Sequence, residues 1–92
     1  MIASFKHRGL KRLYEHDDRS GLSAEQVGKI KRVLARLDEA SKVNNMSLPG
    51  FGLHPLKGKL KGRWAVSVFG NWRIVFRFDS GNVHDVDLVD YH

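Results

Sequence analysis

The chain has 92 residues, no cysteine, and sixteen lysines and arginines against ten acidic residues, which gives a formal net charge of +6. This length suits one domain with a thin hydrophobic core, and the lack of cysteine excludes disulfides and cysteine-ligated zinc. The apolar stretches are far shorter than the ~20 residues of a membrane span. We therefore expect one soluble, cytoplasmic domain over residues 1–92, with no membrane partner.

The positive charge is concentrated in the middle of the chain. An excess of this kind favours polyanionic partners through steering and counterion release. Charge distribution alone fits a nucleic-acid-binding surface and a merely solvated surface equally well. Residues 41–78 contain no acidic residue, but they contain the basic residues Lys42, Lys57, Lys59, Lys61, Arg63, Arg73 and Arg77.

The N-terminal part of the chain predicts a short strand followed by a short helix. Residues 2–5 are an apolar opening that is typical of an edge strand. Residues 8–16 place Leu10, Leu13 and Tyr14 at helical spacing, which predicts an amphipathic helix. A polar stretch at residues 17–21 separates this helix from the next element.

Residues 23–40 predict the clearest helix. Ser23 and Gln26 have the spacing of a capping box, in which each side chain satisfies a backbone N–H at the start of the helix. The basic side chains of this segment lie off its apolar stripe, towards water or a partner. The stripe itself follows steps of three and four, through Val27, Ile30, Val33, Leu34 and Leu37.

The second half of the chain predicts a loop and then a sheet. Residues 43–53 are rich in Asn, Ser, Pro and Gly and predict a loop with a turn at Pro49-Gly50. Residues 64–69 and 72–78 alternate with a period of two and are joined by Gly70-Asn71, which predicts a β-hairpin. Residues 83–91 predict a third strand after a turn at residues 79–82.

This order of elements predicts an α+β domain. We expect the N-terminal helices to pack on one face of a small, mainly antiparallel β-sheet that ends in a C-terminal meander, and we expect the other face to be free. Arg73 and Arg77 share their strand parity with Val75, so both guanidinium groups should project from the free face. A guanidinium group is always charged and can bind phosphate through two nitrogens. A stretch containing Gly58 and Gly62 adds cations that follow a phosphate backbone or simply face water, namely Lys57, Lys59, Lys61 and Arg63.

Two histidines provide candidate acid–base groups. His54 precedes a proline, and His92 follows Asp90 and Tyr91 at the end of the chain. Metal-independent RNA cleavage needs a general base for the 2′-hydroxyl, a general acid for the leaving 5′-oxygen, and cations for the developing charge. Histidine suits the first two tasks because its ordinary pKa is about 6.5, and an aromatic such as Tyr91 can stack on a base. The sequence alone does not show that His54 and His92 meet.

No metal or other cofactor is predicted. His84 with Asp85, or Asp87 with Asp90, are conceivable ligand pairs. The sequence, however, has no H-E-x-x-H motif, no histidine-rich tract and no EF-hand loop. Acidic residues on the last strand more often balance the charge of basic neighbouring strands.

Three short motifs, taken in order, resemble those of one protein family. They are His54-Pro-Leu-Lys-Gly58, Gly70-Asn-Trp-Arg-Ile74 and the terminal Asp90-Tyr-His92. On these motifs the whole chain resembles the HigB toxins, also called plasmid maintenance system killer proteins, of the RelE superfamily. Residues 43–53 show no clear correspondence to the family pattern.

The resemblance implies the toxin of a type II toxin–antitoxin system. Such a toxin is a ribosome-dependent endoribonuclease that cuts mRNA in the A site of the 30S subunit without a metal and so inhibits translation. The implied partner is a helix-turn-helix antitoxin of the HigA kind, and operator DNA is bound only through the toxin–antitoxin complex. The family's functional positions match His54, Lys57, Arg73, Asp90, Tyr91 and His92.

The roles of these residues follow from the resemblance as well. We expect His92 to transfer a proton with the aid of Asp90. We expect His54 and Lys57 to act at the phosphate and Tyr91 to orient the RNA. An exchange of roles between the two histidines stays open.

Three alternatives compete with the endonuclease. A toxin of the same fold that binds DNA gyrase, as ParE-type toxins do, would not need the histidines. A non-catalytic RNA-binding module would need the basic face but not the terminal Asp90-Tyr-His92. In a structural ribosome-associated protein the acid–base groups would be incidental. The combination of His54, Lys57 and His92 favours the endonuclease.

Overall fold

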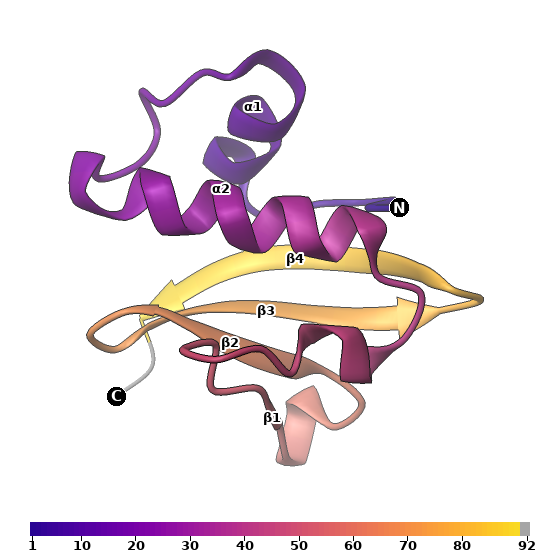
Figure 1. Ribbon diagram of the computed structural model, residues 1–92. Coiled ribbons are helices and arrows are strands. Elements are labelled where there is room, and N and C mark those ends of the chain that lie inside the picture. The colour runs from indigo at the N-terminus through magenta and orange to yellow at the C-terminus, as the bar shows by residue number, and fades with distance from the viewer. Residues whose placement is uncertain (91–92) are drawn as a thin grey trace.

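The structure is a computed structural model that describes residues 1–90. Two helices, α1 (Arg8–His16) and α2 (Ala24–Glu39), precede a four-stranded sheet in the order β1-β2-β3-β4, and every neighbouring pair is antiparallel. Both helices lie on one side of the sheet (Figure 1). The predicted α+β architecture with its C-terminal meander is therefore confirmed. The strands are β1 (His54–Pro55), β2 (Trp64–Phe69), β3 (Trp72–Asp79) and β4 (Asn82–Asp90).

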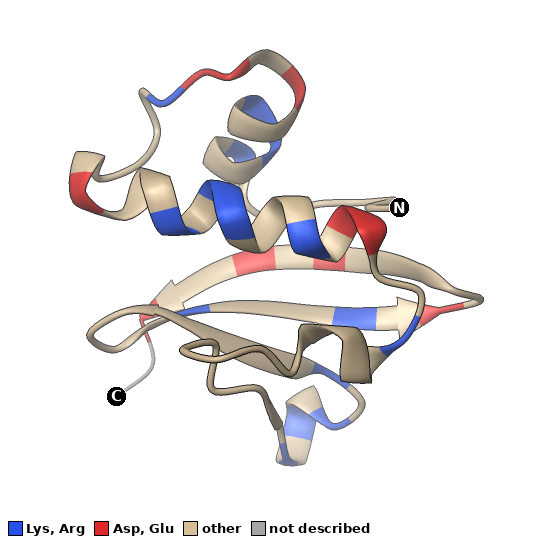
Figure 2. Cartoon of the chain, viewed as in Figure 1, with Lys and Arg blue, Asp and Glu red and all other residues tan. Residues whose placement is uncertain are grey.

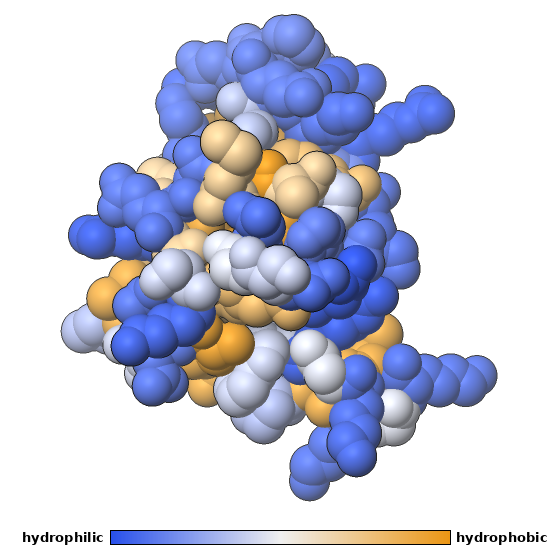
Figure 3. All heavy atoms as spheres, turned by 90° about the vertical axis from the view of Figure 1, so that its right-hand side faces the viewer, coloured by the Kyte–Doolittle hydropathy of each residue, from blue (hydrophilic) through white to orange (hydrophobic). Residues whose placement is uncertain are grey.

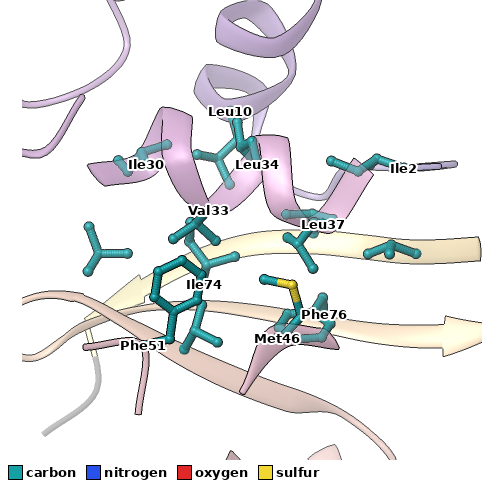
Figure 4. Close-up of a cluster of buried hydrophobic side chains, with 14 of the residues drawn as sticks. Ile2, Leu10, Ile30, Val33, Leu34, Leu37, Met46, Phe51, Ile74 and Phe76 are labelled. Atoms are coloured by element: carbon teal, nitrogen blue, oxygen red, sulfur yellow. The ribbon is translucent and has the colours of Figure 1, made fainter. Parts of the chain in front are cut away.

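The main core lies between α2 and the sheet. Every residue of the predicted apolar stripe of α2 is buried. Val33 and Leu37 point towards the sheet and pack in the same core as Ile74 and Phe76 of β3 (Figure 4). Burial of each such side chain contributes about 1.5–3 kcal/mol, so this layer provides most of the driving force for folding. Leu10 of α1 packs on the opposite side of α2 and completes the core.

The start of α2 differs from the prediction. Ser23 is the N-cap residue, but its side chain makes no capping hydrogen bond, so the predicted capping box is wrong. The Gln26 side chain is buried, with 7% of its surface exposed, instead of folding back over the helix start. The hydrogen bond between these two residues is a backbone one, in which the Gln26 N–H donates to the Ser23 carbonyl at 3.0 Å.

Residues 43–53 are more ordered than the predicted loop. They begin with a 3-10 helix, η1 (Val43–Met46), and bury Met46 and Phe51 in the core. The predicted turn at Pro49-Gly50 is confirmed, with a left-handed Gly50 at φ 82°. The Ser67 N–H donates to the Phe51 carbonyl at 2.6 Å, which ties this segment to the edge of β2.

Both edges of the sheet depart from the sequence pattern. Strand β1 was not predicted because it has only two residues, followed by the 3-10 helix η2 (Gly58–Leu60). The N-terminal residues expected to form an edge strand make two isolated parallel bridges to β4, from Ile2 to Val83 and from Phe5 to Val86. The sheet proper remains four-stranded.

The sheet face opposite the helices is named the open face below. We expected no other part of the chain to pack on this face. At the centre of the face that expectation is wrong. Leu56, Ala65 and Val75 are buried there and pack with Val89. These residues form a small second core, and the polar side chains of the open face stand around it.

No helix within residues 1–90 is long and apolar enough to cross a membrane. At the end of the molecule that carries the N-terminus and the β3–β4 turn, hydrophilic side chains dominate and apolar ones gather in small patches (Figure 3).

Candidate active site

The strand register sets the order of side chains on the open face. His54 of β1 is opposite Ala65, Ala65 is opposite Val75, and Val75 is opposite Asp87. Directly opposed residues on neighbouring strands point to the same side of a sheet. These four residues therefore form one row, with His54 at one edge and Asp87 at the other.

Arg73 stands in the next row of the open face, opposite Ser67 on β2 and Val89 on β4. The Arg73 Nη1 donates to the carbonyls of Gly70, at 2.7 Å, and Trp72, at 3.0 Å. Its Nε is buried and has no hydrogen-bond partner within the described part of the chain. None of the ion pairs formed within residues 1–90 includes Arg73. The β2–β3 turn thus fixes this guanidinium group, and no carboxylate within residues 1–90 pairs with it.

Arg77 and Arg63, at the far end of the open face, have a different environment. Both guanidinium groups bind the same carboxylate, that of Asp85. The distances to its Oδ2 are 2.9 Å from Arg77 Nε and 3.4 Å from Arg63 Nη2. Asp79 adds a longer ion pair with Arg77, at 3.8 Å. Of the three arginines predicted to bind substrate, Arg63 and Arg77 are therefore already engaged by a carboxylate within the protein.

Asp85 owes its position to an irregularity in β4. The β3–β4 register shifts between Val75 and Arg77, and Asp85 adopts a left-handed φ of 56° there. Its backbone N–H donates to the Ser4 hydroxyl at 2.8 Å, which links the site to the N-terminal segment. The hydrogen bond from Arg77, helped by the nearby positive charges, lowers the pKa of Asp85 below its ordinary value of 3.8. The expectation that an acid of the last strand balances basic neighbours is confirmed at Asp85, although the sequence did not single it out.

The His54 ring is oriented by its own loop. Its Nδ1 lies 3.0 Å from the Gly52 carbonyl oxygen. A carbonyl can only accept, so Nδ1 must carry the proton in this bond, and Nε2 carries the lone pair of the neutral ring. A left-handed Gly52, at φ 58°, shapes this turn. The geometry therefore selects the tautomer in which Nε2 is the basic nitrogen.

The predicted lysines extend from the same edge of the sheet. Lys57 directly precedes η2, Lys59 lies within it and Lys61 follows it. All three are exposed, and the η2 region carries basic residues in Figure 2. No carboxylate pairs with them among residues 1–90. They therefore add positive charge to the edge of the sheet that carries His54.

Strand β4 carries the chain to the end of the sheet where Arg73 lies. Asp90 is opposite Trp72, the residue next to Arg73. Tyr91 and His92, which the sequence also predicts as catalytic residues, lie outside the described residues. The structure thus brings Arg73 close to the end of β4. His54 lies two strands away from Arg73, which is roughly 10 Å across the sheet, and two residues away along the strands, which is roughly 7 Å. His54 shares the row of Val75, so along the strands it stands midway between the rows of Arg73 and Arg77.

Comparison with known proteins identifies the class to which this arrangement belongs. Residues 3–92 match the family described as RelE-like toxin of type II toxin-antitoxin system HigB. The chain is also 41% identical over 92 residues to Endoribonuclease HigB of Proteus vulgaris, with 100% of both chains covered. The chain therefore belongs to the HigB-like family of RelE-like toxins of type II toxin–antitoxin systems. The resemblance inferred from the three motifs is confirmed.

Solved structures with low sequence identity share the fold. The chain is similar to the YoeB dimer from Staphylococcus aureus, with a TM-score of 0.62, 19% identity, and 100% and 97% of the two chains covered. It is also similar to the YoeB/ParE toxin from Agrobacterium tumefaciens, with a TM-score of 0.63, 21% identity, and 100% and 99% covered. The YoeB–YefM complex from S. aureus matches at a TM-score of 0.63 and 18% identity, with 100% and 98% covered.

Proposed function

We propose that this toxin is an endoribonuclease that cuts mRNA in the ribosomal A site by metal-independent acid–base chemistry and thereby inhibits translation. The observation that carries the proposal is the Arg73 guanidinium group, which two backbone carbonyls hold on the open face near the end of β4 and which forms no ion pair within residues 1–90. The name of the P. vulgaris relative, an endoribonuclease, supports the same activity.

In the proposed reaction the 2′-oxygen of the RNA attacks the adjacent phosphorus. A general base takes the 2′-proton, the bond to the 5′-oxygen breaks, and a general acid protonates that oxygen, so a cyclic 2′,3′-phosphate is left. His54 has a suitable tautomer for one of these roles, because its Nε2 carries the lone pair. We assign the other proton transfer to His92, aided by Asp90. Tyr91 would orient the RNA.

Arg73 and Lys57 would stabilise the negative charge that develops on the phosphate. A donor that is fixed before the reaction needs no reorganisation in the transition state, and the loss of one such donor typically costs about 10²–10³-fold in rate. The two carbonyl bonds of Arg73 provide this fixing. Lys57, Lys59 and Lys61 are exposed and would follow the substrate backbone. Arg63 and Arg77 would contribute less, since Asp85 already binds them.

We also infer the partner of this toxin. Membership of a type II toxin–antitoxin family supports an antitoxin partner, and a structural neighbour is a YoeB–YefM complex. We propose that the antitoxin is a helix-turn-helix protein of the HigA kind, that operator DNA is bound only by the complex, and that the toxin acts in the cytoplasm.

The role of His54 can be tested by single-turnover cleavage of mRNA bound to ribosomes. His54→Ala should slow cleavage by about 10²–10⁴-fold, the usual contribution of a general acid or base. The matched control is His84→Ala, which removes a histidine opposite Arg77, away from the proposed site, and should change the rate less than threefold. An unchanged rate in His54→Ala would remove His54 from the mechanism.

A further inference from the structure

A second basic site lies on the helical side of the molecule. A cavity of about 440 Å³ opens between α2 and the segment of residues 48–51. Lys29, Arg32 and Arg36 of α2 form one wall, and Leu48, Pro49 and Phe51 contribute apolar surface to the other. None of these residues belongs to the proposed active site, which lies on the open face of the sheet.

The three cations form a stripe along α2. Their spacing of three and four residues places them on one helix face, and seven residues span roughly 10 Å of helix. Arg32 and Arg36 are exposed and take part in none of the ion pairs formed within residues 1–90. Lys31 of the same helix, in contrast, pairs with Asp17 at 3.0 Å. The stripe is visible as basic bands along α2 in Figure 2.

Lys29 joins the stripe to the apolar wall. Its Nζ donates to the Gly50 carbonyl at 2.8 Å and lies 6.0 Å from the centroid of the Phe51 ring. Gly50 faces open space, since a Cβ added there would meet no atom within 4 Å. The cavity therefore has a row of positive charges on one side and an apolar surface on the other, and Lys29 contacts both sides.

A nucleotide matches both walls. Its phosphates are anions that arginine and lysine bind, and its base has apolar faces that pack on side chains such as those of Leu48 and Pro49. An acidic peptide could satisfy the same pair of walls. The charges of the cavity favour a polyanionic strand, because its lining includes three basic residues and no acidic one.

We propose that this cavity binds one nucleotide of a single-stranded RNA segment other than the strand that is cleaved. The base packs against Leu48 and Pro49, while the flanking phosphates bind Arg32 and Arg36 next to Lys29. This inference goes beyond the proposed function, since it concerns RNA binding at a cavity that none of the proposed catalytic residues lines.

The test follows amide NMR signals of the full ¹⁵N-labelled chain during titration with a twelve-nucleotide oligouridylate. The signals of Ala35 and Gly50, which both line the cavity, should shift and saturate. In the Arg32→Gln/Arg36→Gln double variant the affinity read from these two signals should fall roughly 20-fold at 0.1 M salt. Its salt slope should become shallower by about 1.4, because two phosphate contacts at ~0.7 each are lost.

The charge-matched control is Lys6→Gln/Lys11→Gln, which removes two exposed cations near α1. It should change the affinity at the cavity less than threefold. Wild-type signals that do not move with oligouridylate would overturn the proposal, and so would equal losses in both double variants. A stronger response of the same signals to a twelve-residue polyglutamate would assign the cavity to an acidic peptide instead. Mapping of mRNA cleavage decides the proposed endonuclease independently, because neither double variant touches the open face.

Discussion

Arg73 and Arg77 project from the same strand and the same face, yet their surroundings differ. Arg77 binds Asp85 at 2.9 Å and shares that carboxylate with Arg63. Among the described residues, Arg73 is bound by backbone carbonyls alone, and its Nε has no hydrogen-bond partner there. A carbonyl fixes a guanidinium group without cancelling its charge, whereas a carboxylate does both. The two ends of the open face thus separate a structural arginine from one that can bind phosphate.

The largest expected effect concerns these two arginines directly. Arg73→Gln should slow the single-turnover cleavage of ribosome-bound mRNA by about 10²–10³-fold, because a fixed donor to the developing phosphate charge is lost. Arg77→Gln is the matched control and should slow cleavage less than fivefold once its stability is taken into account. Equal losses of cleavage rate in both variants would show that the different surroundings of Arg73 and Arg77 do not affect function.

Asp85→Asn should produce the next largest effect, on folding. The variant loses charge-assisted hydrogen bonds from two arginines, and after allowance for partial exposure we expect the free energy of unfolding to fall by about 1–2 kcal/mol. Urea denaturation at pH 7 measures this value. Because Arg63 and Arg77 are released, RNA should also bind more tightly, while the cleavage rate of bound RNA should not change. A variant as stable as the wild type would contradict the structural role of this carboxylate.

The pH dependence of stability should report the same group. The pKa of Asp85 is lowered in the folded protein, so its contribution is present above the ordinary value of 3.8 and is lost as the pH falls through the lower folded value. Wild type and Asp85→Asn should therefore differ at pH 7 and converge as the pH is lowered below 3.8. A constant difference across that range, measured by denaturation at each pH, would assign the stability to packing instead.

The smallest effect concerns a carboxylate on the helical side. The Tyr14 hydroxyl donates to Asp38 at 2.6 Å, and this bond raises the pKa of Tyr14 to about 12. Its stabilising contribution should be complete below pH 10 and disappear as the pH rises through 12. In a Tyr91→Phe background, absorbance titration should show Tyr14 ionising near pH 12, and Asp38→Asn should bring that value back towards 10. Ionisation near 10 in both proteins would exclude the bond.

The elements that the sequence predicted well are those with a repeated pattern. The apolar stripe of α2 and the alternation around Ile74 and Phe76 each involve several residues, so one deviation does not hide them. Strand β1 has two residues and shows no such pattern, and Met46 and Phe51 are single apolar residues in a polar segment. Their burial depends on tertiary contacts, which a local pattern does not report.

The candidate site was predictable as a set of residue types and less so as an arrangement. Strand parity placed Arg73 and Arg77 on one face correctly. It gave no sign that Asp85 would adopt a left-handed conformation at a register shift and bind one of them. The assignments of His54, Lys57 and Asp90 remain predictions, and those of Tyr91 and His92 lie outside the described residues.

The central claim is cleavage of mRNA on the ribosome, and primer extension on a defined mRNA in a reconstituted translation system tests it most directly. Wild-type protein should produce new 5′ ends within A-site codons, these ends should require ribosomes, and His92→Ala should abolish them. Inhibition of translation without new ends would contradict cleavage and indicate a ribosome-binding protein. Unchanged translation would exclude the ribosome as the target, and the alternative of a toxin that binds DNA gyrase would be tested next.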